Sequence, residues 1–189
     1  MSSLQAFAVD LRSRHFATEP LIVANVWDVA SARAVADAGH PVLATSSAAV
    51  AASLGRGDHE QMSAEEALAA VARIARAVEM PVSADMEAGY GLPPRELVDR
   101  LLEAGAAGCN LEDSDYHGPG GLTEAERQAD YLAAVSEIAR ASGVEIVINA
   151  RVDVYLQSGY PPDGRADEAL RRGRLYLASG ATCVYPRPG

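Results

Sequence analysis

The sequence has little cysteine, a shortage of basic charge and no long apolar run. Its two cysteines, Cys109 and Cys183, lie in apolar segments and lack metal-ligand spacing to each other or to histidine. We therefore expect buried free thiols in a reducing compartment. No apolar stretch approaches the roughly 20 residues of a membrane span, and the N-terminus lacks the basic and apolar segments of a secretory signal. These absences predict a cytoplasmic protein.

The charge balance is acidic, with 16 Lys and Arg against 26 Asp and Glu and a formal net charge of −10. Nucleic acids and anionic membranes attract basic surfaces, so neither is an expected partner. An acidic surface still allows a local basic pocket for a small anionic substrate. The 189 residues, 49% of them hydrophobic, suffice for one domain with a sizeable core, which we place at 1–189.

Short continuous apolar runs alternate with amphipathic helical segments along the whole chain. The runs predict strands at 21–26, 41–46, 81–86, 107–112, 144–150 and 181–185. The segments between them predict helices at 29–38, 63–78, 94–104, 123–142 and 167–179. Capping boxes are expected at Ser63 with Glu66 and at Thr123 with Glu126. Continuous apolar strands separated by helices indicate a parallel sheet covered by helices.

Six successive strand–helix units fit either a doubly wound sheet or a (β/α)₈ barrel. A dinucleotide-binding sheet would place a Gly-x-Gly-x-x-Gly turn after its first strand, and this chain has none there. Polar residues instead follow nearly every strand, which is the pattern of a TIM barrel. A barrel needs eight units and about 250 residues. We therefore predict an incomplete α/β barrel that ends after its sixth strand, with an open six-unit sheet as the other possibility.

Two pairs of carboxylates end neighbouring strands. Asp85 and Glu87 are two residues apart and should point the same way on an extended strand. Glu112 and Asp113 end the next strand. Three or four carboxylates around one point repel unless a cation lies between them or one stays protonated. Oxygen ligands of this kind suit Mg²⁺, although helix caps or surface charges would explain the first pair without a metal.

Other strand ends offer groups for an anion. Arg151 suits bidentate capture of a carboxylate or phosphate, or an ion pair with Asp153 or Glu112. The small residues Ser46, Ser47 and Ala48 could present backbone N–H groups to an anion, or form an ordinary turn. Trp27 would be a pocket wall or a core residue, and Asp28 could orient a neighbour or the waters of a metal.

Two glycine-rich loops could close over such a site. The segment 55–60 contains Asp58 and His59 between strand two and its helix, and 117–121 follows strand four and begins with His117. Glycines around charged side chains suit mobile lids. Ordinary solvated loops are the alternative for both segments. A catalytic role for His117 is a weaker hypothesis than mobility of the loop that contains it.

Five motifs in order resemble the isocitrate lyase/phosphoenolpyruvate mutase superfamily. They run from Leu21 to the C-terminus and comprise Asn25-Val26-Trp27-Asp28-Val29-Ala30-Ser31-Ala32, Ala44-Thr45-Ser46-Ser47 with Leu54-Gly55-Arg56-Gly57-Asp58, Asp85-Met86-Glu87-Ala88-Gly89-Tyr90-Gly91, Asn110-Leu111-Glu112-Asp113-Ser114 and Asn149-Ala150-Arg151-Val152-Asp153. The resemblance implies an (α/β)₈ barrel and Mg²⁺-dependent chemistry on C–C or P–C bonds of 2-oxo or enol-type carboxylates. It also implies a homo-oligomer, since family members are commonly tetramers.

The resemblance also suggests roles for single residues. Asp85 looks like a direct Mg²⁺ ligand, and Glu87 and Glu112 look like ligands through water. The segment of Ser46 and Ser47 resembles one whose backbone binds the substrate carboxylate or phosphonate, and Arg151 resembles the anion-binding arginine. Asp58 is similar to the gating-loop acid of the phosphonate branch, which acts as nucleophile or base.

The loop after strand four departs from the family pattern. The C–C lyases of the family carry Lys-Arg-Cys-Gly-His there, with cysteine as acid and base, whereas this chain has Asp115-Tyr116-His117-Gly118-Pro119-Gly120-Gly121. The Lys and Asn of the phosphonate enzymes are also missing. The chain therefore resembles a branch with Glu-Ala-Gly-Tyr-Gly and Asn-Leu-Glu-Asp-Ser motifs whose substrates the family pattern does not fix.

These observations predict a Mg²⁺-dependent lyase or mutase that acts on a small 2-oxo acid through an enolate. Asp58, or a group near His117, would move the proton or attack the migrating group. An oxaloacetate decarboxylase or a phosphonopyruvate hydrolase is the first alternative. The second is an inactive, shortened barrel that binds only a metal or ligand.

Overall fold

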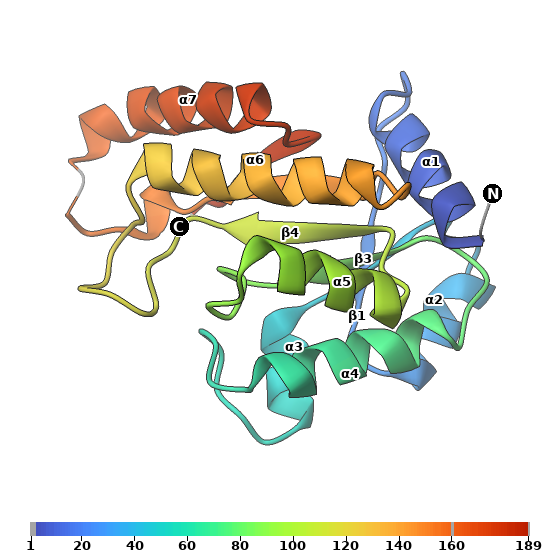
Figure 1. The fold of residues 1–189 in the computed structure, drawn as a ribbon. Coiled ribbons are helices and arrows are strands. Elements are labelled where there is room, and N and C mark those ends of the chain that lie inside the picture. Colours follow the sequence, from blue (N-terminus) through green and yellow to red (C-terminus); the bar gives the residue numbers. More distant parts are fainter. Residues whose placement is uncertain (1–2, 160, 189) are drawn as a thin grey trace.

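The computed structural model describes residues 3–159 and 161–188 and consists of parallel strands joined by helices (Figure 1). The strands are β1 (Ala24–Val26), β2 (Leu43–Thr45), β3 (Val82–Asp85), β4 (Gly108–Glu112), β5 (Val147–Val152) and β6 (Cys183–Pro186). The helices are α1 (Ser3–His15), α2 (Val29–Asp37), α3 (Ser47–Ser53), α4 (Ala64–Ala75), α5 (Pro94–Ala104), α6 (Ala125–Ala141), α7 (Pro162–Ala178) and the 3₁₀ turn η1 (Val154–Leu156).

The six strands form one parallel sheet in the order β1-β2-β3-β4-β5-β6. This order excludes a doubly wound sheet, in which the strand order reverses at a switch point, and it confirms the parallel α/β fold of the barrel type. Within the described residues the sheet stays open, with β1 and β6 at its edges. The register sets Asp85 beside Asn110 and Glu112 beside Arg151, so the polar strand ends meet at one rim.

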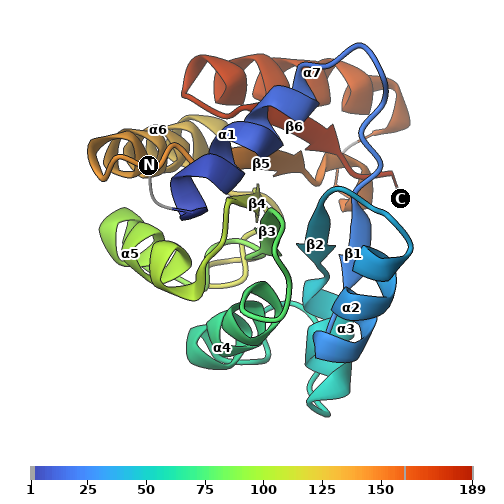
Figure 2. The ribbon, with the colours of Figure 1, turned by 90° about the vertical axis from the view of Figure 1, so that its right-hand side faces the viewer.

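Helices α2 to α7 cover the outer side of the curved sheet (Figure 2). The largest core cluster lies between β3, β4 and β5 and the inner faces of α4 to α7. Helix α1 has a different position, because its buried Ala8 and Leu11 pack against Val42, Ala107 and Val147 near the starts of the strands. It therefore covers the end of the sheet opposite to the polar rim.

Several boundaries differ from the sequence predictions. The capping box at Ser63 and Glu66 is confirmed, but the one at Thr123 was wrong, because α6 begins at Ala125 and has no side-chain cap. Helix α7 begins five residues before the predicted position, at Pro162, where the fixed φ of proline suits a first helical turn. Helices α1 and α3 were not predicted. Each buries few residues, and they leave only a weak apolar stripe in the sequence.

The structure also tests the expectations about the two cysteines and about membrane-spanning helices. Cys109 is a buried free thiol, whereas the free thiol of Cys183 is only partly buried. Within 3–159 and 161–188, no helix combines the length and the apolar character that crossing a membrane requires.

Candidate active site

Asp85 ends β3 and has one carboxylate oxygen engaged and one free. Its Oδ2 accepts hydrogen bonds from the backbone N and the Oγ of Ser47, at 2.9 and 2.8 Å. Its own backbone N donates to Thr45 Oγ1 at 2.8 Å, which fixes the strand end. The Oδ1 atom is buried and has no hydrogen-bond partner within residues 3–159 and 161–188. Such an orphaned acceptor is costly, and a bound cation would satisfy it.

Glu87 lies just beyond β3 in a left-handed backbone conformation, with φ of 48°. Its side chain is 2% exposed. Tyr90 donates its hydroxyl to Oε1 at 2.7 Å, and the backbone N of Glu60 donates to Oε2 at 2.8 Å. Burial raises the pKa of Glu87 above its usual value, those two hydrogen bonds oppose the rise, and the charges of Asp58 and Asp85 add to it.

Glu112 and Arg151 form an ion pair across neighbouring strand ends. Arg151 Nη1 lies 2.6 Å from Glu112 Oε2, and its Nε and Nη2 each donate to Asp153 at 2.7 Å. Tyr116 donates its hydroxyl to the other oxygen of Glu112. Burial raises the pKa of Glu112 to about 8, although Arg151 and Tyr116 act against it. The ion-pair interpretation of Arg151 is therefore confirmed, with both proposed acids.

Asp113 does not join the carboxylates at the rim. It follows Glu112 at the strand end, so its side chain points away from the one before it. Its Oδ2 accepts from Tyr176 and Arg172 of α7, at 2.8 and 3.0 Å. The expectation of a fourth carboxylate at the same point was wrong for Asp113. Asp153, which the sequence analysis named only as a partner of Arg151, contributes to the polar rim instead.

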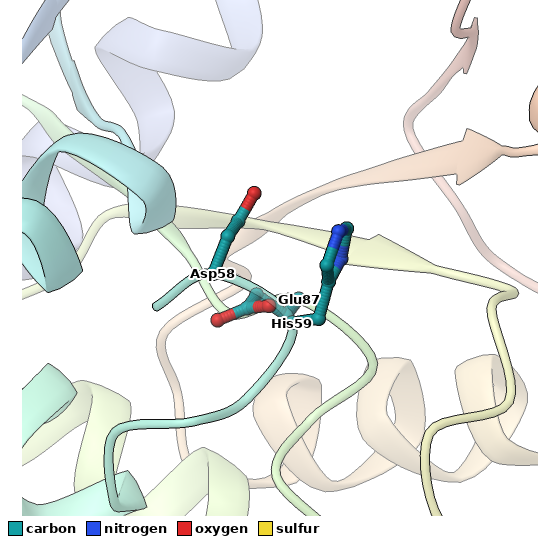
Figure 3. Close-up of side chains that lie close together, drawn as sticks. All are labelled: Asp58, His59 and Glu87. Carbon is teal, nitrogen blue, oxygen red and sulfur yellow. The ribbon is translucent and has the colours of Figure 1, made fainter. Parts of the chain in front are cut away.

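The loop between α3 and α4 brings Asp58, His59 and Glu60 to the rim. One ligand atom from each of Asp58, His59 and Glu87 lies within 4.8 Å of the others. Figure 3 shows Asp58 and His59 rising from adjacent positions of the loop beside the Glu87 carboxylate. His59 and Glu60 both have positive φ, at 65° and 55°. This unusual backbone for non-glycine residues is typical of functional loops.

The loop after β4 contacts the first loop, and its Tyr116 also reaches Glu112. His117 Nε2 lies 2.5 Å from Glu60 Oε2. His117 therefore contacts the loop that carries Asp58. Tyr116 links the two loops as well, because its hydroxyl lies 3.2 Å from His59 Nδ1. Tyr116 and Glu60 lie in the two predicted loops, but neither was predicted as a site residue. No spacing signal identifies either residue, since both act across loops.

The remaining predicted residues lie around β1 and β2. Asp28 is the N-cap of α2 and forms a capping box with Ser31. Ser46 is the N-cap of α3, whereas Ser47 contacts Asp85 directly. Ala48 and Trp27 are exposed. The roles of these five residues in substrate binding remain predictions.

The oxygen donors at the rim fit a hard divalent cation. Asp85, Glu87 and Glu112 supply only carboxylate oxygens, and the orphaned Oδ1 of Asp85 is the natural direct ligand. Among the residues that the structure describes, Arg151 is the guanidinium that interacts with this group, through Glu112 and the charge of Asp85. Without a cation, the raised pKa values of Glu87 and Glu112 mean that bound protons relieve part of the like-charge repulsion. Among the described residues, the three side chains whose ligand atoms lie within 4.8 Å of one another are Asp58, His59 and Glu87, so the structure groups Glu87 with these loop residues and does not group it with Asp85 and Glu112.

Comparisons with known proteins identify the family of the chain. The family model described as phosphoenolpyruvate phosphomutase matches residues 11–188. The chain belongs to this family. The phosphoenolpyruvate phosphomutase family is part of a wider group, since one structural neighbour, 2,3-dimethylmalate lyase, is described as a member of the phosphoenolpyruvate mutase/isocitrate lyase superfamily.

Three relatives illustrate the range of chemistry within the family. A candidate phosphonomutase from Burkholderia cenocepacia is 41% identical, with a TM-score of 0.86 over 94% of this chain and 73% of its own. The phosphoenolpyruvate phosphomutase of Streptomyces platensis is 28% identical, with a TM-score of 0.82 over 94% of this chain and 62% of its own. An oxaloacetate decarboxylase of Rhodopseudomonas palustris is 31% identical over 86% of this chain and 56% of its own.

The chain spans about three fifths of the length of the curated relatives that it matches. Among these relatives are lyases that act on C–C bonds, and the structural neighbours include mutases. Family membership therefore supports an enzyme of the lyase and mutase class.

Proposed function

We propose that the chain is a Mg²⁺-dependent lyase or mutase that cleaves or rearranges a C–C or P–C bond of a small 2-oxo acid through its enolate. The observation that carries the proposal is the buried, unpartnered Oδ1 of Asp85 in a group of carboxylates beside Arg151. Mg²⁺ bound there would supply charge stabilisation for the developing enolate oxygen.

The chain's own residues would hold and orient the substrate. Arg151 uses three N–H groups on Asp153 and Glu112, and a guanidinium has five. The remaining two can donate to a substrate carboxylate. Because the ion pairs fix the plane of the guanidinium, the substrate binds to a preorganised group. Ser47, at the start of α3, donates its backbone N–H and its hydroxyl to Asp85 and so holds that carboxylate at the rim.

The loop residues would exclude water and move protons. Asp58 belongs to the α3–α4 loop and lies beside Glu87, which follows β3. In the proposal Asp58 acts as the base or nucleophile. His117 holds that loop through Glu60. Its part in the proposed reaction is therefore to keep the loop closed over the substrate, while Tyr116 joins the loop to Glu112.

The first alternative is oxaloacetate decarboxylation, which is favoured by the 31% identity to a Rhodopseudomonas palustris oxaloacetate decarboxylase. It needs the same cation and the same enolate but no carbon nucleophile. Phosphonopyruvate hydrolysis would need Asp58 or a water molecule to attack phosphorus. An inactive barrel that only binds a metal or ligand is the remaining alternative.

Product analysis separates these possibilities. The chain would be incubated with oxaloacetate, phosphonopyruvate and 2-methylmalate-type acids, each with Mg²⁺ and each with excess chelator. We expect turnover of one of them with Mg²⁺ only, and Asp85→Asn should lower that turnover by roughly 100-fold or more. Asp99→Asn, an exposed acid on α5, is the matched control and should change nothing.

Three results would contradict the proposal. Turnover that survives in chelator would exclude the metal, and turnover of none of the acids would favour the inactive barrel. Equal activity of Asp85→Asn and Asp99→Asn would exclude Asp85 as the ligand.

A further inference from the structure

A buried series of charged groups leads from α7 to the guanidinium of Arg151. On α7, Arg172 and Tyr176 are four residues apart and lie on one face of the helix. Arg172 Nη1 lies 3.0 Å from Asp113 Oδ2, and the Tyr176 hydroxyl donates to the same oxygen at 2.8 Å. Arg172 is 2% exposed and Asp113 is 0% exposed. Helix α7 is therefore fastened to the end of β4 by a fully buried ion pair.

The second oxygen of Asp113 continues the series toward the rim. Its Oδ1 accepts the backbone N–H of Asp153 at 2.9 Å. The carboxylate of Asp153 in turn accepts two N–H groups of Arg151 at 2.7 Å each, and Ser114 donates its hydroxyl to it at 2.7 Å. The position of the Asp153 backbone thus depends on Asp113, and the orientation of Arg151 depends on Asp153.

Because side chains alternate along a strand, the end of β4 contacts both the polar rim and the helices. Glu112 faces the rim and contacts Arg151, whereas Asp113, the next residue, faces the helices and contacts Arg172. Burial raises the pKa of Asp113, and the hydrogen bonds from Asp153 and Tyr176 and the charge of Arg172 oppose that rise. A carboxylate at this depth needs those partners to be present together.

We propose that Arg172 is a positioning residue for the substrate anion, which acts through Asp113 and Asp153 to set the plane of the Arg151 guanidinium. The proposal rests on the function proposed above only in taking Arg151 as the anion-binding group. Its structural half, the dependence of Arg151 on Arg172, stands on the contacts alone. A small displacement of an oriented group can cost a large part of its effect on binding or rate.

The chain supplies a matched control in the neighbouring residue. Arg171 also binds Glu168, but it is exposed and its other partner is the surface acid Glu126. We would prepare Arg172→Gln, Arg172→Lys and Arg171→Gln in the full chain. If Arg172→Gln does not fold, Tyr176→Phe replaces it, since that change removes a single hydroxyl from Asp113.

The first measurement is the dissociation constant of oxalate, an enolate mimic, at saturating Mg²⁺. We expect Arg172→Gln to weaken oxalate binding by roughly 10- to 100-fold. Arg172→Lys should recover part of the loss, and Arg171→Gln should bind as the wild type does. Equal affinities of Arg172→Gln and the wild type would overturn the proposal while leaving the proposed function intact.

The second measurement needs no ligand. The Nε–H resonance of Arg151 in ¹⁵N-labelled protein is identified by its absence in Arg151→Lys. We expect Arg172→Gln to shift or broaden this resonance and Arg171→Gln to leave it unchanged. If the wild type fails to bind oxalate, the proposed function fails and this resonance still decides the matter: an unchanged signal in Arg172→Gln would overturn the positioning role.

Discussion

Single residues at the rim carry an unusual concentration of like charge. Asp85, Glu87, Glu112 and Asp153 are gathered there with Arg151 among them. Burial disfavours the ionised forms of Glu87 and Glu112 and raises the pKa of each, whereas a cation would favour the ionised forms. The pKa shifts at Glu87 and Glu112 are therefore features of the metal-free protein, and we expect metal binding to release protons.

The raised pKa of Glu112 predicts a definite dependence of stability on pH in chelator. The folded pKa of about 8 exceeds the ordinary value of 4.5, so the folded state holds the proton more tightly than the unfolded state. The contribution of Glu112 to stability is thus complete below about 4.5 and is lost as the pH rises toward 8.

Chemical denaturation of the wild type and Glu112→Gln measures this contribution. The wild-type free energy of unfolding minus that of the variant should fall as the pH rises from 5 to 8, by up to about 1.4 kcal/mol per pH unit. Glu66, a partly exposed residue of the α4 capping box whose pKa is lowered, provides the control variant Glu66→Gln, which should show no such fall. A difference that grows with pH would contradict the assignment.

The sequence predicted the rim residues better than their partners. Asp85, Glu87, Glu112 and Arg151 were predictable because parallel strands bring their carboxyl ends to one edge. The side of the sheet on which Asp113 lies was not predictable, since it depends on where β4 ends. Glu60 and Tyr116 were missed because their contacts join two loops, and loop conformation leaves no periodic signal in the sequence.

At the scale of elements, the helix starts differ in how they are capped. Ser63 caps α4 and accepts the N–H of Glu66 at 3.1 Å, whereas α6 starts after Glu124 without any side-chain cap. Both starts carry the same sequence signature of Thr or Ser followed by Glu three residues later. The difference arises because the backbone of Thr123 is engaged by Asp113 and Arg172 instead.

This difference predicts unequal effects of two similar substitutions. Ser63→Ala should lower the free energy of unfolding by about 1 kcal/mol, because it leaves an N–H group of the first turn without a partner. Thr123→Ala removes no capping bond and should cost clearly less. Denaturant unfolding of both variants checks the prediction, and an equal loss would show that Thr123 does cap α6.

At the scale of the whole molecule, the order of strands was predictable from the alternation of apolar runs and helices. The position of α1 across the starts of the strands was not, because its apolar positions are few. The described structure leaves β1 and β6 as edges and several large apolar side chains exposed. Leu170 and Leu177 on α7 are 57% and 49% exposed and lie on one face, seven residues apart.

We propose that the protein is a homo-oligomer that covers this face of α7. The double variant Leu170→Glu, Leu177→Glu should have a lower molar mass by light scattering than the wild type at the same concentration. Val9→Glu, at a residue of α1 with similar exposure, is the control and should leave the mass unchanged. A monomeric wild type would contradict the proposal.

The most direct test of the metal-assisted site is a crystal structure of the protein with Mg²⁺ and oxalate. We predict an ion on Asp85 Oδ1, with Glu87 and Glu112 reaching it directly or through water, and an oxalate carboxylate on the free N–H groups of Arg151. An ion bound elsewhere, or oxalate that contacts neither the ion nor Arg151, would contradict the account.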